Sequence, residues 1–258
     1  MPGSHARPTP PTTDDITVDF GIDDIILSYH SDYWIAADHD DGVQQWDIGM
    51  HFAEDGPGPQ FGRISLHLVD HNRCFDPIAA CDALSEDLFT ISKALFDPSL
   101  GLRQDLWDRL SCPGNTIIVD SVSIDSRLRG HGLGVLLTGM ALDYLSNGTG
   151  VIALFPGPVE RRTDTPYEEA CARLGRAWSR LGFTPYRDGV WILDPGLITL
   201  HEAVAAEQQR LAGHRWRITL RYTSNHWGGD ITAITSVMSK SAPWSRPPTA
   251  YTAPLQAT

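Results

Sequence analysis

The sequence has few lysines and no long apolar run, and the second shortage excludes a class of protein. Lys93 and Lys240 are the only lysines, so arginine supplies most of the positive charge of the 258-residue chain. No apolar run approaches the ~18 residues needed to span a membrane, so we expect no membrane association. The N-terminal stretch lacks the apolar core of a secretory signal, and we therefore expect a cytoplasmic protein.

Cysteines are also scarce, and their spacing predicts no metal site. None of them forms a C-x-x-C pair, and no histidine cluster lies beside them at zinc-binding spacing. Without a secretory signal, reduced and mostly buried thiols are expected. The four cysteines are Cys74, Cys81, Cys112 and Cys171.

The charge balance is acidic, with a formal net charge of −12 and a sequence pI near 5.1. Binding to a nucleic-acid backbone depends mainly on lysine and arginine, so this balance predicts no nucleic-acid partner. It suits a cationic small molecule or an amine better, although solubility alone explains the same excess of carboxylates.

Hydrophobic periodicity predicts a chain of mixed strands and helices. Alternating apolar residues indicate strands at about 25–30, 33–37, 45–52 and 61–69, followed by helices at 76–96 and 102–110. Later helices are predicted at 166–181 and 199–211, and a strand is predicted at 215–222. Residues 1–16 and 239–258 are rich in Pro, Ser and Thr and are expected to be disordered or extended.

The stretch from Asp120 to Leu145 combines a strand, a glycine-rich turn and an amphipathic helix. Val122 and Ile124 belong to the strand, and Arg129-Gly130-His131-Gly132-Leu133-Gly134 forms the turn. Glycines let the backbone approach a ligand closely, while the first N–H groups of the helix and its dipole attract an anion. The stretch therefore predicts a phosphate site.

Two common phosphate motifs do not fit this turn. A P-loop requires Lys followed by Ser or Thr after its last glycine, whereas Val135 and Leu136 follow Gly134. A dinucleotide-binding fingerprint requires G-x-G-x-x-G, whereas the glycines here are spaced by two. Arg-x-x-Gly-x-Gly remains, and it is filled by Arg129, Gly132 and Gly134.

This pattern resembles motif A of the GCN5-related N-acetyltransferase superfamily, whose members bind acetyl-coenzyme A. The turn matches the form R-G-x-G-[ILV]-G, and Val122-Ser123-Ile124-Asp125 matches the strand end that precedes it. Trp178-Ser179-Arg180-Leu181-Gly182-Phe183 resembles the superfamily's Y-x-x-L-G-F segment, with Trp in place of Tyr. The resemblance covers roughly residues 115–193 and is poor upstream.

The resemblance implies an α/β fold with a mixed sheet and a splayed pair of central parallel strands. The acyltransferase-like domain is expected at 17–195, followed by a helix and strand extension at 196–238. That extension lies outside the common core of the superfamily. We expect it to pack as an added strand and helix or to mediate homodimer formation.

The resemblance also implies a donor site for acetyl-CoA. Pantetheine is expected to bond to backbone groups around Val122 and Ile124, and the pyrophosphate to lie over the N–H groups of the turn. The turn residues concerned are Arg129, Gly130, His131, Gly132, Leu133 and Gly134. Asp120 is the first candidate for the general base, with a structural carboxylate as the alternative, and Ser121, Ser123 and Glu160 are weaker candidates.

The implied function is N-acetyl transfer to an amine of a small molecule or peptide, without a metal. Trp178 occupies the position of the usual tyrosine acid, and an indole N–H is not an acid at physiological pH, so the general acid is unassigned. A non-catalytic acyl-CoA-binding or protein-interaction module of the same fold is the alternative function.

Overall fold

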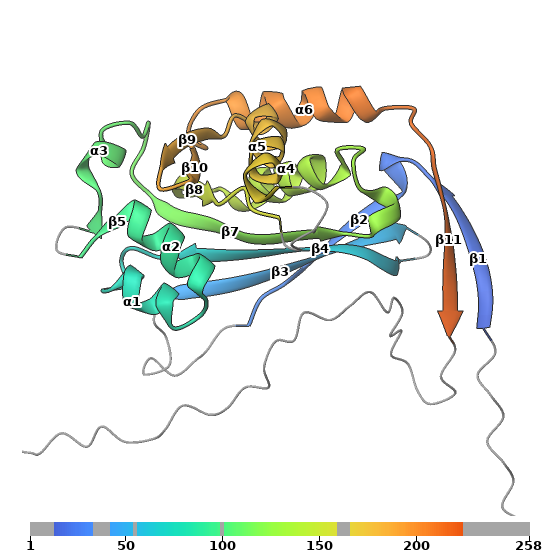
Figure 1. Cartoon of the computed structure of the whole chain (residues 1–258), viewed down its shortest axis with the longest axis horizontal. Coiled ribbons are helices and arrows are strands. Elements are labelled where there is room, and N and C mark those ends of the chain that lie inside the picture. Colours follow the sequence, from blue (N-terminus) through green and yellow to red (C-terminus); the bar gives the residue numbers. More distant parts are fainter. Residues whose placement is uncertain (1–12, 33–41, 54–55, 99–100, 159–165, 224–258) are drawn as a thin grey trace, which may run out of the picture.

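A mixed sheet of seven strands forms the centre of the protein, and helices cover its faces (Figure 1). The computed structural model describes residues 13–32, 42–53, 56–98, 101–158 and 166–223. Within these residues the strand order is β2-β3-β4-β7-β8-β10-β9, and every neighbouring pair is antiparallel except β7 with β8. The predicted α/β class with a mixed sheet is confirmed.

The strands of this sheet are β2 (Ile25–His30), β3 (Val43–Ala53), β4 (Pro57–Val69), β7 (Asn115–Ile124), β8 (Thr149–Leu154), β9 (Thr184–Arg187) and β10 (Val190–Leu193). A separate short hairpin pairs β5 (Phe96–Asp97) with β6 (Gly101–Leu102). The strand predicted at 33–37 lies outside the described residues.

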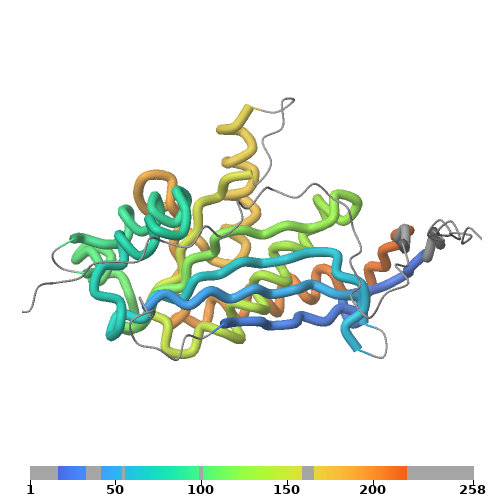
Figure 2. Tube along the Cα trace, turned by 90° about the horizontal axis from the view of Figure 1, so that it is seen from below, coloured from blue at the N-terminus to red at the C-terminus, as the bar shows by residue number. Residues whose placement is uncertain are grey.

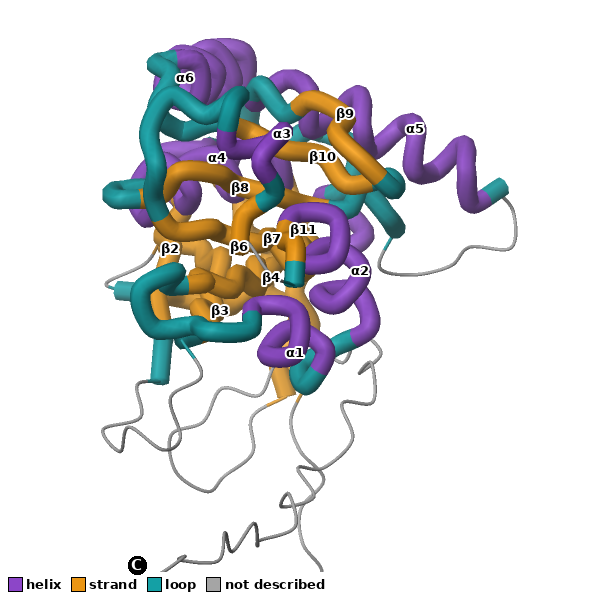
Figure 3. The backbone as a smooth tube through the Cα atoms, turned by 90° about the vertical axis from the view of Figure 1, so that its left-hand side faces the viewer, coloured by secondary structure: helices purple, strands orange, loops and turns teal. Residues whose placement is uncertain are grey.

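The helices lie in two layers, with α4 and α6 on one side of the sheet and α1 and α2 on the other (Figure 3). Strand β8 has apolar side chains on both faces of the sheet, so both faces must be covered by helices. Ile152 and Leu154 pack into the core on the α4 side, whereas Val151 and Ala153 pack into the core on the α2 side. The helices are α1 (Pro77–Asp82), α2 (Glu86–Leu95), α3 (Gln104–Trp107), α4 (Leu133–Leu145), α5 (Tyr167–Trp178) and α6 (Thr199–Leu211), with 3-10 turns η1 (Ile22–Asp24), η3 (Ser126–Leu128) and η4 (Ser179–Leu181).

The single helix predicted at 76–96 is two helices in the structure. Asp76 caps α1, and its carboxylate accepts a hydrogen bond from the backbone N–H of Ala79 at 3.0 Å. The Ser85 hydroxyl then accepts from the N–H of Leu88 at 3.1 Å and starts α2. A serine that satisfies an orphan N–H begins a new helix, and apolar periodicity on both sides of it does not reveal the break.

A β-bulge interrupts β7 at Asp120. Leu66 of β4 pairs with Val119, and the preceding residue of β4, Ser65, pairs with Ser121, so that Asp120 is an extra residue on β7. An extra residue shifts the alternation of side chains by one position. Four apolar residues on both sides of the bulge therefore face the core on the α4 side, namely Ile117, Val119, Val122 and Ile124.

The two ends of the described chain form a second, two-stranded sheet from β1 (Thr13–Phe20) and β11 (Trp216–Thr223). Phe20 and Trp216 anchor it in the core, with ring centroids 5.6 Å apart. Because β1 begins at Thr13, the last four residues of the predicted lead-in at 1–16 form a strand. Its partner lies about two hundred residues downstream, which no local pattern shows. Residues 1–12 and 224–258 lie outside the described residues.

Candidate functional site

The glycine turn links the end of β7 to the start of α4, as the sequence predicts. Gly130 and Gly132 have φ values of +85° and +90°, and Gly132 is the N-cap residue of α4. These left-handed conformations favour glycine, since a side chain is strained there. Leu133 is fully buried and packs in the core, so its side chain does not face a ligand at this helix end.

The edge of β7 is open beside this turn. The parallel pairing of β7 with β8 ends at Val119 and Leu154, although β7 continues to Ile124. A Cβ on Gly134 would lie 3.3 Å from Ile124 Cδ1 and 3.7 Å from Val122 Cγ1, so α4 starts directly against the unpaired part of the strand. The unpaired strand edge and the turn therefore lie next to each other.

The side chains of Arg129 and His131 are not placed as a pair that would clamp a phosphate. Arg129 Nε donates to the backbone oxygen of Ile124 at 2.8 Å, so this guanidinium holds the turn against the end of β7. The His131 ring is exposed and lies edge-on to Trp216, with centroids 6.4 Å apart. Its backbone oxygen accepts a hydrogen bond from Arg210 Nη2 at 3.3 Å.

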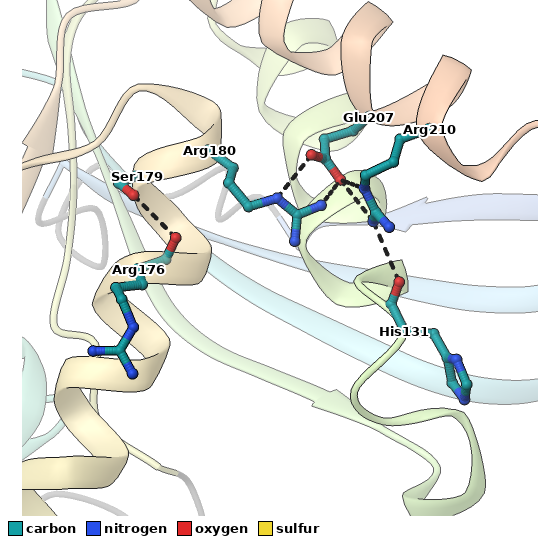
Figure 4. A network of polar contacts seen from close by, with 6 residues as sticks. All are labelled: His131, Arg176, Ser179, Arg180, Glu207 and Arg210. Carbon is teal, nitrogen blue, oxygen red and sulfur yellow. Dashed lines mark hydrogen bonds and ion pairs between the residues drawn. The ribbon is translucent and has the colours of Figure 1, made fainter.

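Two arginines to which the sequence motifs assign no role lie over the turn (Figure 4). Arg180 of η4 and Arg210 of α6 both bind the carboxylate of Glu207, which is 6% exposed. Arg180 donates from Nε to Oε1 at 2.8 Å and from Nη2 to Oε2, and Arg210 donates from Nη2 to Oε2 at 2.8 Å. A Cβ on Gly132 would lie 2.3 Å from Arg210 Nη2 and 3.4 Å from Arg180 Nη2.

These features fit the acyl donor that the motif implies. Backbone N–H groups at a helix N-terminus and nearby guanidinium groups bind phosphate oxygens. An unpaired strand edge offers backbone groups to the amide-bearing pantetheine arm, in the manner of strand addition. The residues that would hold the donor are the backbone of Val122 and Ile124 and the N–H groups of the turn.

Asp120 lies half-buried at the bulge, beside the open edge of β7. Burial raises the pKa of its carboxyl group, and the negative charges of Asp87 on α2 and Asp47 on β3 raise the pKa further. Asp47 itself pairs with Arg63, at 2.6 Å between Oδ1 and Nη2. A carboxylate with a raised pKa is a better proton acceptor than an ordinary one.

The face of the sheet on the α2 side is polar near the bulge. Ser65 pairs with both Asp47 and Ser121, which gives one polar row across β3, β4 and β7, and Arg63 pairs with Ser123 in a second row across β4 and β7. Figure 2 shows that α1 and α2, drawn in green-blue, lie over one end of this face. The polar face is therefore suited to an acceptor that approaches from the side opposite α4. The candidate base Glu160 lies outside the described residues.

Trp178 is in the core rather than in a position for proton transfer. It is 9% exposed and packs edge-on against Phe183, with ring centroids 6.1 Å apart. Tyr167, at the other end of α5, is partly exposed. Its hydroxyl lies 3.1 Å from where a Cβ on Gly157 would be, beside the loop that leaves β8. The general acid therefore stays unassigned.

In the described part of the chain, no group of three or more His, Cys, Asp or Glu side chains is arranged to hold a metal ion. The helices described are all too short or too polar to cross a membrane.

No protein-family model matches the chain, and no curated protein matches it. Among solved structures, a tyrosine-to-phenylalanine mutant of KacT matches with 10% identity and a TM-score of 0.34, over 63% of this chain and 75% of that one. A KacTA–DNA complex matches with 12% identity and a TM-score of 0.34, over 64% and 74%. AtaT complexed with acetyl-methionyl-tRNAfMet matches with 10% identity and a TM-score of 0.35, over 69% and 99%. Matches this distant concern the fold and do not show the activity or acceptor of this chain.

One prediction needs correction in the light of these structures. The net charge of −12 was taken to exclude a nucleic-acid partner. Two of the three structures named above contain nucleic acid, so this exclusion is wrong. The physical reason is that net charge is a sum over the whole chain, whereas phosphate groups respond to the local field. Local clusters of arginine, such as Arg180 with Arg210, exist here despite the acidic total.

Proposed function

We propose that this protein transfers the acetyl group of acetyl-CoA to an amine. The observation that carries the proposal is the opening between β7 and β8 beyond Val119 and Leu154, which continues into the glycine turn at the start of α4. A donor of this kind has an extended arm and a phosphate-bearing end. The unpaired strand edge suits the arm, and the helix N-terminus suits the phosphates.

The proposed reaction is direct attack of the amine nitrogen on the thioester carbonyl carbon. A C–N bond forms, the C–S bond breaks, and one proton leaves the nitrogen. Acetyl-CoA supplies the activated acyl carbon and the thiolate leaving group. The chain supplies position, through the backbone of β7, and a backbone N–H beside the opening, such as that of Val122, to stabilise the oxyanion.

Asp120 is proposed as the general base. An alkylammonium group has a pKa near ~10, so the acceptor must lose a proton before it attacks. Asp120 is half-buried beside the opening, and its raised pKa moves it toward the pH range where a base is most effective. A cationic acceptor is also attracted by the charges of Asp47 and Asp87 that act on Asp120.

The proposed acceptor is an amine of a small molecule or peptide, or the amine of an aminoacyl-tRNA. The last is included because AtaT was solved in complex with acetyl-methionyl-tRNAfMet. A homodimer remains a proposal, and cytoplasmic localisation is an expectation that rests on the sequence alone.

The alternative function is an acyl-CoA-binding module that has lost turnover. Burial of Trp178 at the position of the usual tyrosine acid favours it, since that position then supplies no acid to the departing thiolate. Free-thiol release from acetyl-CoA, measured with amines of all three acceptor classes and followed by product mass, separates the two functions. An acetylated product supports the transferase, and tight acetyl-CoA binding without product on any acceptor supports the module.

A further inference from the structure

We propose that Arg180 and Arg210 bind a phosphate group of the acyl donor, so that helix α6 forms part of the donor site. This inference rests on the proposed function and adds to it. Helix α6 lies outside residues 115–193, the region that resembles the acetyltransferase motifs. The extension that the sequence left without a role would thus complete the site of the glycine turn.

The position of the two guanidinium groups carries the argument. Arg210 Nη2 donates to the backbone oxygen of His131, within the turn, at 3.3 Å. The two Nη2 atoms lie 2.3 Å and 3.4 Å from the place of a Cβ on Gly132. An anion bound by the N–H groups at the start of α4 would therefore lie within reach of both guanidinium groups.

The cluster of Arg180, Arg210 and Glu207 carries a net positive charge. Within the described residues, Glu207 is the only carboxylate that forms an ion pair with Arg180 or Arg210. Two guanidinium groups and one carboxylate leave a net charge of about +1 beside the positive end of the α4 dipole. If the cluster served only to attach α6 to η4, one arginine would be enough to neutralise Glu207.

Both arginines also have N–H groups that are accessible and not used in the bonds to Glu207. The hydrogen bonds to Glu207 use Nε and Nη2 of both arginines, and Nη1 of each has no hydrogen bond within the described part of the chain. The side chains of Arg180 and Arg210 are 35% and 42% exposed, whereas Glu207 is buried. Glu207 therefore orients two forks whose remaining N–H groups are available to phosphate oxygens.

The test measures donor binding by isothermal titration calorimetry to the full chain. The ligands are acetyl-CoA, its 3′-dephospho form, and S-acetyl-pantetheine, which has no phosphate. The variants are Arg180→Gln and Arg210→Gln, with Arg210→Lys to keep the charge while removing the fork. Arg176→Gln is the control, since Arg176 is an exposed arginine of α5 whose side chain points away from the cluster (Figure 4).

Each of the two glutamine variants is expected to raise the Kd for acetyl-CoA about tenfold, as the loss of a charge-assisted hydrogen bond predicts. Arg210→Lys is expected to show a smaller rise, and the Kd for S-acetyl-pantetheine is expected to stay within twofold. If the glutamine variants do not raise the Kd for the 3′-dephospho ligand, the arginines bind the 3′-phosphate. If they raise that Kd as they raise the Kd for acetyl-CoA, the arginines bind the pyrophosphate.

An unchanged Kd for acetyl-CoA in both glutamine variants overturns the inference. An equal rise for S-acetyl-pantetheine also overturns it, because the effect would then not depend on phosphate. Failure of the wild-type chain to bind acetyl-CoA is a different result, which refutes the proposed function itself.

Discussion

Val119 of β7 and Leu154 of β8 are the last residues paired in the parallel part of the sheet. Strand β7 continues for five more residues with partners on β4 alone, and Asp120, the first of them, is the extra residue of a bulge. A bulge re-aims side chains and ends regular pairing. The same residue thus lies where the strand edge opens and where the side-chain alternation changes, which makes it the centre of the proposed site.

Replacement of Gly132 tests the donor site. Gly132→Trp is expected to raise the Kd for acetyl-CoA at least tenfold, because a side chain there collides with Arg210 and blocks the start of α4. Titration calorimetry measures the effect. Gly148→Ala is the control, since Gly148 also has a positive φ and no atom within 4 Å of an added Cβ but lies outside the turn, beyond the end of α4. Unchanged binding by Gly132→Trp contradicts the donor site.

Asp120→Asn tests the general base. The variant is expected to lower kcat about a hundredfold and to remove the acidic limb of the pH–rate profile, because the amide accepts no proton. Asp87→Asn should shift that limb to lower pH, since it removes a charge that raises the pKa of Asp120. An unchanged profile in Asp120→Asn removes the residue from this role.

The raised pKa of Asp120 also predicts how the stability of the protein depends on pH. The folded-state pKa of Asp120 is raised, so the folded chain binds its proton more tightly than the unfolded chain does. Ionisation of Asp120 therefore costs stability as the pH rises from the unfolded pKa through the folded pKa. Asp120→Asn should be more stable than the wild type at neutral pH, and the difference should vanish below about pH 4. Urea unfolding across this range would show the opposite trend if Asp120 were a stabilising structural carboxylate.

Glu207→Ala tests the buried partner of the two arginines. The change should lower the free energy of unfolding by about 1–2 kcal/mol, less than for a fully buried pair because both guanidinium groups are partly exposed. Chemical denaturation measures this difference. Glu202→Ala, at an exposed position of the same helix, should cost less than about 1 kcal/mol, which is the size of a helix-dipole contribution. Equal effects in the two variants would show that the cluster does not stabilise the fold.

A substitution at Gly139 tests how α6 packs against α4 and η4. A Cβ there would lie 2.8 Å from Leu181 Cδ2 and 2.9 Å from Val204 Cγ2, so α4, η4 and α6 meet at this point. Gly139→Val should destabilise the chain by about 1–3 kcal/mol through overpacking. Combination with Val204→Ala should recover part of the loss, because the second change makes room. Strict additivity in this double-mutant cycle would contradict the contact.

Much of the fold follows from local pattern, and the errors have physical causes. The positions of β7, α4 and α6 agree with the predictions because each has a strong period or a clear stop, such as Gly148 after α4. The helix break at Ser85 was missed because apolar periodicity continues on both sides of it. The strand at Thr13 was missed because its hydrogen-bond partner is Thr223.

The sequence by itself determined the glycine turn on which the proposed donor site rests, since glycines at two-residue spacing between a strand and a helix restrict the backbone locally. Tertiary structure alone decided what lies around that turn. The pKa of Asp120 depends on its burial by the packed chain and on Asp87 and Asp47, which come from other elements. The charge over Gly132 depends on Arg180 and Arg210, which α6 and η4 bring together around Glu207. Such contacts join residues far apart in the chain, and only packing brings them within range.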